Sequence, residues 1–313
     1  MIPFRSILVP LDGSELAEKA LAPAKQIALA MAQRAVDEKR TRLILLRVVS
    51  PLVVLAADPY LYDEMTRMSA DEAKAYLSEV ASNLSTALST ADLAIETHIV
   101  NGSPAETIVQ FASENDVDLI VMSSHGRTGS RRWVYGSVAE KVMHHAPCAT
   151  AIIRAHVDVA MFQNRNILVP LDGSELAERA LAPALALAEA VNSNVYMLRV
   201  VTGREPVPES MSPAGEQIEV ALGKADADER AEAEGYLQRM YTAHQNQHLF
   251  FDVQTTSGDT ADAIINYAEQ HKIDLIVMSS HGRSGIGRWL HGSVAEKVLR
   301  GADCATLIMR DQS

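Results

Sequence analysis

The chain has 313 residues, of which 48% are hydrophobic and 22% are charged, and its formal net charge at pH 7 is −12. This composition is typical of a globular protein, and the length predicts two domains of roughly 150 residues each. The acidic balance argues against binding to nucleic acid or to an anionic membrane, because both need a basic surface. It does not argue against a small nucleotide, which needs only local hydrogen-bond donors.

Five short apolar runs in the first half predict β-strands. They are Ile7–Leu11, Leu43–Val49, Ile95–Val100, Leu119–Met122 and Cys148–Ile153. Near-continuous apolar strands that alternate with helices are typical of a parallel sheet with helices on both faces. The predicted fold class is therefore doubly wound α/β, in which ligands bind beyond the carboxyl ends of the strands.

Helical patterns separate these strands. They are expected from Ser14 toward Arg34, over 69–90, from Pro104 onward, and over Ser137–His144. Pro23 should kink or interrupt the first helix, and residues 51–68 are expected to form an irregular loop. Ser103 is expected to cap the third helix, with Pro104 in its first position.

The second half of the chain repeats the first. Residues 5–24, RSILVPLDGSELAEKALAPA, return as 165–184, RNILVPLDGSELAERALAPA, and residues 118–150 return as 274–306 with similar agreement. A unit of this length is a whole domain, since solenoid repeats run roughly 20–50 residues. The loops that stayed alike follow strands, where ligands bind, which favours two similar binding sites.

The repeat predicts one domain over 1–154, a linker over 155–164 and a second domain over 165–313. The fifth strand of each domain is an edge that must be covered, and pairing of the two edges is one solution. Two chains can associate further into a homodimer. The equivalent cysteines, Cys148 and Cys304, are expected to be buried core thiols rather than a disulfide framework.

The chain shows no sign of export or membrane insertion. No apolar run approaches the roughly 18 residues of a membrane span. The opening segment, MIPFRSILVPLDGSE, lacks the regions of a signal peptide. We therefore expect a cytoplasmic protein with no membrane partner.

An aspartate follows the first strand of each half. Asp12 lies in Pro10-Leu11-Asp12-Gly13-Ser14, and Asp172 has the same place in the second half. A carboxylate at the end of a buried strand can accept hydrogen bonds from an adenine amino group or a ribose hydroxyl. The alternative is an aspartate that only forms a turn or caps a helix, because Asp-Gly is a common turn.

A glycine- and serine-containing loop follows the fourth strand. It reads Ser-Ser-His-Gly over 123–126, then nine residues, then Gly136-Ser137, and it recurs from Ser279 to Ser293. Glycine lets a backbone approach a phosphate closely, and a helix N-terminus attracts anions. The alternative is that these glycines serve only tight turns. Neither GxxxxGK[ST] nor a GxGxxG after the first strand is present.

With PLDGSELAE after the first strand and SSHG-(nine)-GSVAEKV near the end of each half, the chain resembles the universal stress protein family. It looks like a tandem member of the ATP-binding type. The resemblance implies two tandem doubly wound parallel five-stranded sheets, similar to adenine-nucleotide α-hydrolases, with strand order 3-2-1-4-5. The family's nucleotide-binding members carry G-x-x-G-(nine)-G-[ST]. Ser123 and Ser279 replace the first glycine, where serine either crowds the phosphates or donates to them; we favour retained binding.

The resemblance also assigns roles in ATP binding. The aspartates would contact adenine or ribose, the strand-end valines would meet the base through the backbone, and the glycine loops would hold phosphates. The residues so implied are Pro10, Asp12, Val48, Met122, Ser123, Gly126, Gly136, Ser137 and Val138 in the first half, and Pro170, Asp172, Val200, Met278, Ser279, Gly282, Gly292, Ser293 and Val294 in the second.

The function we predict is nucleotide-dependent stress signalling to an unknown protein partner, through binding rather than turnover. No phosphate-loop lysine, paired metal carboxylates or water-positioning base accompanies the motif, so we assign no catalytic residue and no protein metal site. A weak ATPase activity is compatible with this, with Asp12 or Asp172 helping to hold Mg²⁺ or Mn²⁺. The alternatives are a nucleotide-free interaction protein and a hydrolase or nucleotidyl-transfer enzyme.

Overall fold

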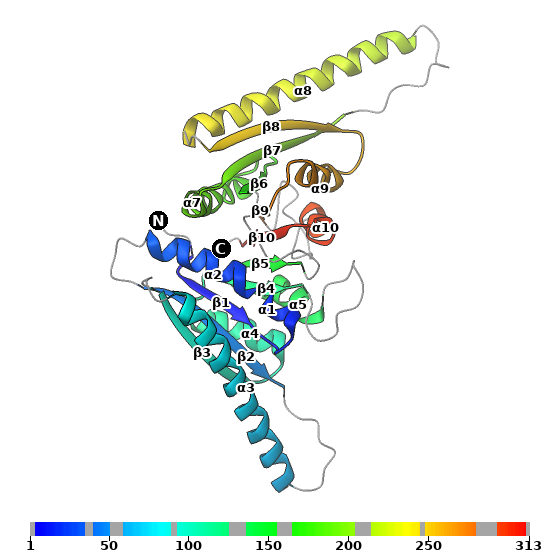
Figure 1. Ribbon diagram of the computed structural model, residues 1–313. Helices are drawn as coiled ribbons and strands as arrows, with labels where there is room; N and C mark the ends of the chain where they lie inside the picture. The colour runs from blue at the N-terminus through cyan, green and yellow to red at the C-terminus, as the bar shows by residue number, and fades with distance from the viewer. Residues whose placement is uncertain are drawn as a thin grey trace.

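The computed structural model describes residues 4–34, 40–50, 59–88, 93–124, 136–154, 165–203, 214–244, 248–279 and 293–310. These residues form a single ten-stranded sheet with helices on both faces (Figure 1). The order of strands is β3-β2-β1-β4-β5-β10-β9-β6-β7-β8. Each half therefore has the order 3-2-1-4-5, as predicted.

The elements of the two halves correspond one to one. The first half contains β1 (Ser6–Pro10), α1 (Glu15–Glu18), α2 (Leu21–Gln33), β2 (Thr41–Val49), α3 (Pro59–Leu88), β3 (Leu93–Asn101), α4 (Pro104–Glu114), β4 (Leu119–Ser123), α5 (Ser137–His145) and β5 (Ala149–Ile153). The second half contains β6 (Asn166–Pro170), α6 (Glu175–Glu178), α7 (Leu181–Val191), β7 (Asn194–Thr202), α8 (Ala214–His244), β8 (Leu249–Thr256), α9 (Thr260–Gln270), β9 (Leu275–Ser279), α10 (Ser293–Gly301) and β10 (Ala305–Met309).

The inner strands β1, β4 and β9 are apolar along nearly their whole length because both faces of the sheet are buried there. Successive side chains point to opposite faces, so Ile7 and Val9 pack with α2 and α3, whereas Leu8 packs with α4 and α5. All three are fully buried. Within each half the paired strands are parallel. The predicted doubly wound α/β fold is therefore confirmed.

Two expectations about the helices are corrected. The first helix is interrupted at Lys19 and Ala20 rather than at Pro23. A proline ring clashes with the carbonyl of the residue four positions earlier, which here is Lys19, so the break precedes the proline. The expected loop over 51–68 is wrong for 59–68, because α3 begins at Pro59, a residue suited to a first helical position. Residues 51–58 lie outside the described part of the chain.

The predicted start of α4 is confirmed in part. Pro104 is its first residue and Ser103 occupies the capping position, but the Ser103 side chain makes no capping hydrogen bond. The cysteine prediction holds for Cys148, which is buried, whereas Cys304 is partly buried, and both thiols are free. Burial raises the pKa of each thiol to about 12. Among the described helices, none is both long and apolar enough to cross a membrane.

The two halves join at β5 and β10, which pair in antiparallel orientation near the middle of the sheet (Figure 1). Ala151 lies opposite Leu307 in this pairing. Each strand would otherwise present an open row of backbone donors and acceptors. The edge-to-edge pairing that the sequence allows is therefore the one that the chain adopts.

Two arginines reinforce this junction from equivalent positions. Arg154 follows β5, is 5% exposed, and donates to the Leu299 carbonyl in α10 of the other half. Arg310 follows β10 and donates from Nη2 to the Met143 carbonyl in α5 at 2.8 Å. Both carbonyls lie in the last turn of a helix, the negative end of its dipole. Each half thus caps the last helix of the other.

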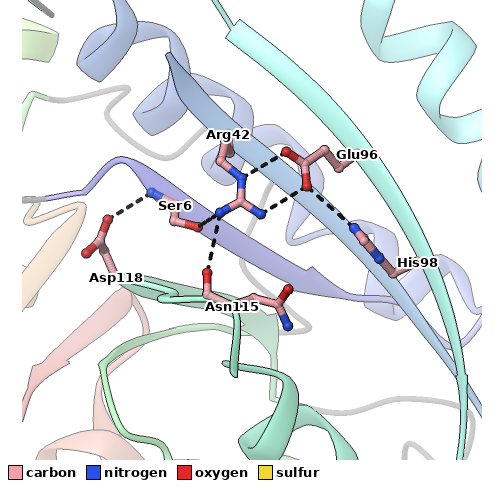
Figure 2. Close-up of polar contacts among 6 residues, drawn as sticks. All are labelled: Ser6, Arg42, Glu96, His98, Asn115 and Asp118. Atoms are coloured by element: carbon pink, nitrogen blue, oxygen red, sulfur yellow. Dashed lines mark hydrogen bonds and ion pairs between the residues drawn. The ribbon is translucent and has the colours of Figure 1, made fainter. Parts of the chain in front are cut away.

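A second polar network ties the amino ends of the strands in the first half (Figure 2). Arg42 makes a two-pronged contact with Glu96, Nε to Oε1 at 2.8 Å and Nη2 to Oε2 at 3.0 Å. Asp118 accepts from the backbone N–H groups of Arg5 and Ser6, both at 2.9 Å. The network therefore holds β1, β2, β3 and the entrance to β4 together.

We predict that Arg310→Ala lowers the free energy of unfolding by about 1–3 kcal/mol, because it removes a partly buried hydrogen bond and leaves the Met143 carbonyl without that donor. Urea unfolding measures this. The matched control is Arg300→Ala, whose side chain pairs with Glu296 on the helix surface and which should cost less than about 1 kcal/mol. Equal losses in both variants would contradict a role for Arg310 at the junction.

A pH-dependent contribution is expected from Glu96. The hydrogen bond from Arg42 holds the pKa of the Glu96 carboxyl below its ordinary value. Its charge therefore stabilises the fold above the unfolded pKa of about 4.3, and this contribution is lost as pH falls through the folded pKa. Glu96→Gln should be less stable than the parent at neutral pH, by up to about 1 kcal/mol, and the difference should vanish in acid. A difference in urea midpoint that is independent of pH would contradict this.

Candidate nucleotide site

A cavity of about 610 Å³ opens at the carboxyl ends of β1, β2 and β4. Beyond β1 the chain enters α1 and α2 on one face of the sheet, and α5, which follows β4, packs on the other. Adjacent strands whose connections leave in opposite directions create a crevice, the usual ligand position in this fold class. The cavity is completed by α3 and by the first residues of α4 and α5.

The described first-half residues that the sequence predicted for the site all line this cavity. They are Pro10, Asp12, Val48, Met122, Ser123, Gly136, Ser137 and Val138. Gly126 lies outside the described residues. The chain thus brings together segments that are more than 120 residues apart in sequence.

The second half places the corresponding residues at the same positions on its own strands. Pro170 ends β6 and Asp172 follows it, Val200 lies in β7, and Met278 and Ser279 end β9. Ser293 and Val294 begin α10. Gly282 and Gly292 fall outside the described part of the chain.

Asp12 organises the turn after β1. Its Oδ1 accepts from the Ser14 backbone N–H at 3.0 Å and from the Ser14 hydroxyl at 2.5 Å. Ser14 Oγ in turn accepts from the Ala17 N–H at 3.1 Å and caps α1. Gly13 has a φ of 78°, which favours glycine. The turn-forming interpretation of Asp12 is therefore correct, and the same residue also lines the cavity.

The second half repeats this turn. Asp172 accepts from the Ser174 N–H at 2.9 Å and from its hydroxyl at 2.6 Å. Ser174 accepts from the Ala177 N–H at 3.2 Å, and Gly173 has a φ of 82°. The local sequence DGSELA encodes the same geometry twice.

The N-terminus of α5 lies at the cavity wall. Gly136 is its capping residue and has no side chain to bond the first free N–H groups, which are thus available to an anion. Gly136 is held beside the end of β4, since its N–H donates to the Ser124 carbonyl at 2.9 Å and the Ser124 N–H donates to the Ile153 carbonyl at 2.8 Å. Ser123, which stands where the motif has glycine, is 6% exposed and lines the same cavity.

One wall of the cavity consists of residues that the motifs did not predict. Ser69, Glu72, Ala73 and Tyr76 of α3 line it, as does Arg47 of β2. They fell in or beside a stretch that diverged between the halves. A signal existed nevertheless: EAxxYL over 72–77 recurs at 232–237, and LRVV over 46–49 recurs at 198–201.

The site contains no dense group of metal ligands among its described residues. Across the described part of the chain, no group of three or more histidine, cysteine, aspartate or glutamate side chains is placed to hold a metal ion. The charged residues that line the cavity there are Asp12, Arg47 and Glu72. The histidines of the two Ser-Ser-His-Gly segments, His125 and His281, lie outside the described residues.

Comparison with known proteins decides the family. The model of the universal stress protein family matches the chain twice, over residues 3–154 and 163–310. The chain belongs to the universal stress protein family. Its two matches show the tandem arrangement that the repeat predicts.

Individual universal stress proteins agree with this assignment. One from Methanocaldococcus jannaschii is 31% identical over 146 residues, which are 47% of this chain and 82% of that protein. One from Mycobacterium bovis is 28% identical over 223 residues, 70% of each chain. The crystal structure of a universal stress protein from Archaeoglobus fulgidus covers 99% of both chains with a TM-score of 0.68 at 21% identity, and so shares the fold.

The capping serines provide a test of the turn geometry. Ser14→Ala and Ser174→Ala should each lower the free energy of unfolding by about 1 kcal/mol, because each removes a cap that is hydrogen-bonded in the structure. Ser103→Ala is the control, since the Ser103 side chain makes no such bond and its loss should cost clearly less. Chemical unfolding of the three variants measures the effect. A Ser103 variant as destabilised as the other two would contradict this account of the turns.

Proposed function

We propose that this universal stress protein binds ATP at the carboxyl ends of the strands in both halves. The observation that carries the proposal is the polarity of the first-half cavity: an aspartate turn lines it at β1, and a helix N-terminus lines it beyond β4. Adenosine offers hydrogen-bond donors to the aspartate turn, and a triphosphate offers negative charge to the helix N-terminus. ATP can therefore bind at both ends of the cavity. A volume of about 610 Å³ falls within the range of about 300–1,000 Å³ typical of small-molecule sites.

In this proposal Asp12 accepts from the adenine amino group or a ribose hydroxyl, and the apolar flank of the base contacts Met122. Val48 contributes backbone groups at the end of β2. Gly136, Ser137 and Val138 hold the phosphates through backbone N–H groups and the Ser137 hydroxyl. The proposed second site uses the equivalent residues, from Asp172 to Val294.

We propose that Mg²⁺ or Mn²⁺ enters with the triphosphate. A cation of this type commonly keeps several waters and takes one or two carboxylates together with substrate phosphates. Besides Asp12, which this proposal assigns to adenosine, the carboxylate that lines the described cavity is Glu72. The donor set therefore fits an ion carried by the nucleotide and does not require a protein cage.

The proposed action is binding, with hydrolysis slow at most. Rapid phosphoryl transfer depends on several cations placed around the phosphates, and the cavity's described lining has one cationic side chain, Arg47. Bound nucleotide would order the loops at the strand ends and favour one state of the protein. In this proposal a protein partner in the cytoplasm recognises that state and links it to the stress response.

Calorimetric titration of nucleotide-free protein with ATP and magnesium tests the proposal. We expect saturable binding that Asp12→Asn weakens by about tenfold or more at one site, because asparagine keeps the turn acceptor but removes the charge. Glu114 is the last residue of α4 and is not part of the described cavity lining, so Glu114→Gln should bind ATP as the parent protein does. No binding by the parent would favour a nucleotide-free interaction protein, and turnover of many molecules per second would favour an enzyme.

A further inference from the structure

A hydrogen-bonded path runs from Asp12 to the long helix α3. Asp12 accepts from Ser14, Ser14 caps α1, and Glu18 is the last residue of α1. The Tyr76 hydroxyl of α3 donates to Glu18 Oε1 at 2.9 Å. The proposed adenosine contact is thus connected to the opposite wall of the cavity through one short helix.

Tyr76 also lies beside a second support of the same loop. The Arg47 guanidinium carbon is 6.0 Å from the centre of the Tyr76 ring. Arg47 Nη1 donates at 3.3 Å to the carbonyl of Leu11, the residue before Asp12. Arg47 therefore contacts the aspartate turn directly and Tyr76 contacts α1 through Glu18, and both line the cavity.

The Tyr76 hydroxyl is a donor at all physiological pH values. Burial, and after it the hydrogen bond to the Glu18 carboxylate, raise the pKa of Tyr76. The same two causes raise the pKa of Tyr236. A protonated phenol that donates to a carboxylate forms one of the stronger hydrogen bonds in proteins.

The arrangement recurs in the second half. Tyr236 donates to Glu178 Oε1 at 2.9 Å, and Arg199 Nη1 donates to the Leu171 carbonyl at 3.3 Å. The surrounding helices have diverged: DEAKAYLSEV over 71–80 corresponds to AEAEGYLQRM over 231–240.

Other tyrosines of the second half have no tyrosine at the corresponding position of the first half. Tyr196, Tyr241 and Tyr267 correspond to the first-half residues Ile44, Ala81 and Phe111. Packing alone is satisfied by a different side chain at each of these positions. Retention of the Tyr–Glu pair against this background points to a role at the cavity rather than to packing.

We propose that Tyr76 and Tyr236 are positioning residues of the two nucleotide sites, and that they act through Glu18 and Glu178 on the aspartate turns. The inference rests on the proposed function. It adds that one Tyr–Glu pair in each half positions the residues that contact adenosine. It also makes α3 and α8, which flank opposite ends of the sheet (Figure 1), part of the binding apparatus.

The test removes one hydroxyl at a time. Tyr76→Phe should weaken ATP binding at the first site by roughly tenfold and leave the second unchanged, and Tyr236→Phe should do the reverse. The affinity for ADP should fall by the same factor as the affinity for ATP, because both nucleotides carry adenosine. Tyr241→Phe is the control, since the centre of the Tyr241 ring lies 5.8 Å from that of Phe251 and both residues are partly buried against the core. Calorimetry with each nucleotide supplies the affinities.

Rescue separates positioning from simple loss of structure. Glu18→Gln keeps an acceptor for the Tyr76 hydroxyl and should retain most of the affinity, whereas Glu18→Ala should reproduce Tyr76→Phe and add little to it in the double variant. Unchanged ATP affinity in Tyr76→Phe would overturn the inference while leaving the proposed function intact. A change in the ATP-to-ADP affinity ratio would also overturn it, since the effect would then lie at the phosphates. Absence of ATP binding by the parent protein overturns both.

Discussion

The parallel pairing of β1 with β4 is the constraint on which the site depends. The two strands are joined at Ile7–Leu119 and Leu8–Ile120, and all four side chains are fully buried. Their carboxyl ends lie side by side, while the chain beyond β1 and the helix after β4 cover opposite faces of the sheet. Polar loops are therefore held next to each other above a rigid apolar base. The cavity exists because the connections diverge at this point.

Duplication turns this single arrangement into a symmetric molecule. Alone, each half would leave one edge of its fifth strand unpaired. The antiparallel pairing of β5 with β10 covers both edges. The apolar cluster on one face of the sheet runs through both halves without a break. Arg154 and Arg310 then satisfy helix carbonyls across the junction. These contacts cover the open strand edges and join the two halves in one sheet. A nucleotide bound in either half, as we propose, would therefore act on a common structure.

Sequence patterns predicted most of this because the local and global signals agree. Apolar runs such as Ile7–Leu11 became strands since burial on both faces leaves no room for alternation, and the turn at Asp12 follows from Asp-Gly-Ser chemistry. The prediction failed where a distant contact decides. Apart from Pro59, which suits a first helical position, no local signal was used to favour a helix over a long loop in residues 59–68. Tyr76 meets Glu18 only once α3 packs on the sheet. Comparison of the two halves, rather than of motifs, would have found Tyr76 and Arg47.

We propose that the crevice at the strand ends of each half is a nucleotide site, and that the protein acts through occupancy of this site rather than through turnover. The cavity has a carboxylate turn and a helix N-terminus at its wall, whereas its described lining holds one cationic side chain, Arg47, and fast phosphoryl transfer needs several. The most direct measurement is to purify the protein without added nucleotide, denature it, and identify the released small molecules by chromatography and mass spectrometry. The account predicts ATP at a ratio that approaches one molecule for each half of the chain. Protein that releases no adenine nucleotide, and takes up none when ATP and magnesium are added, would contradict it.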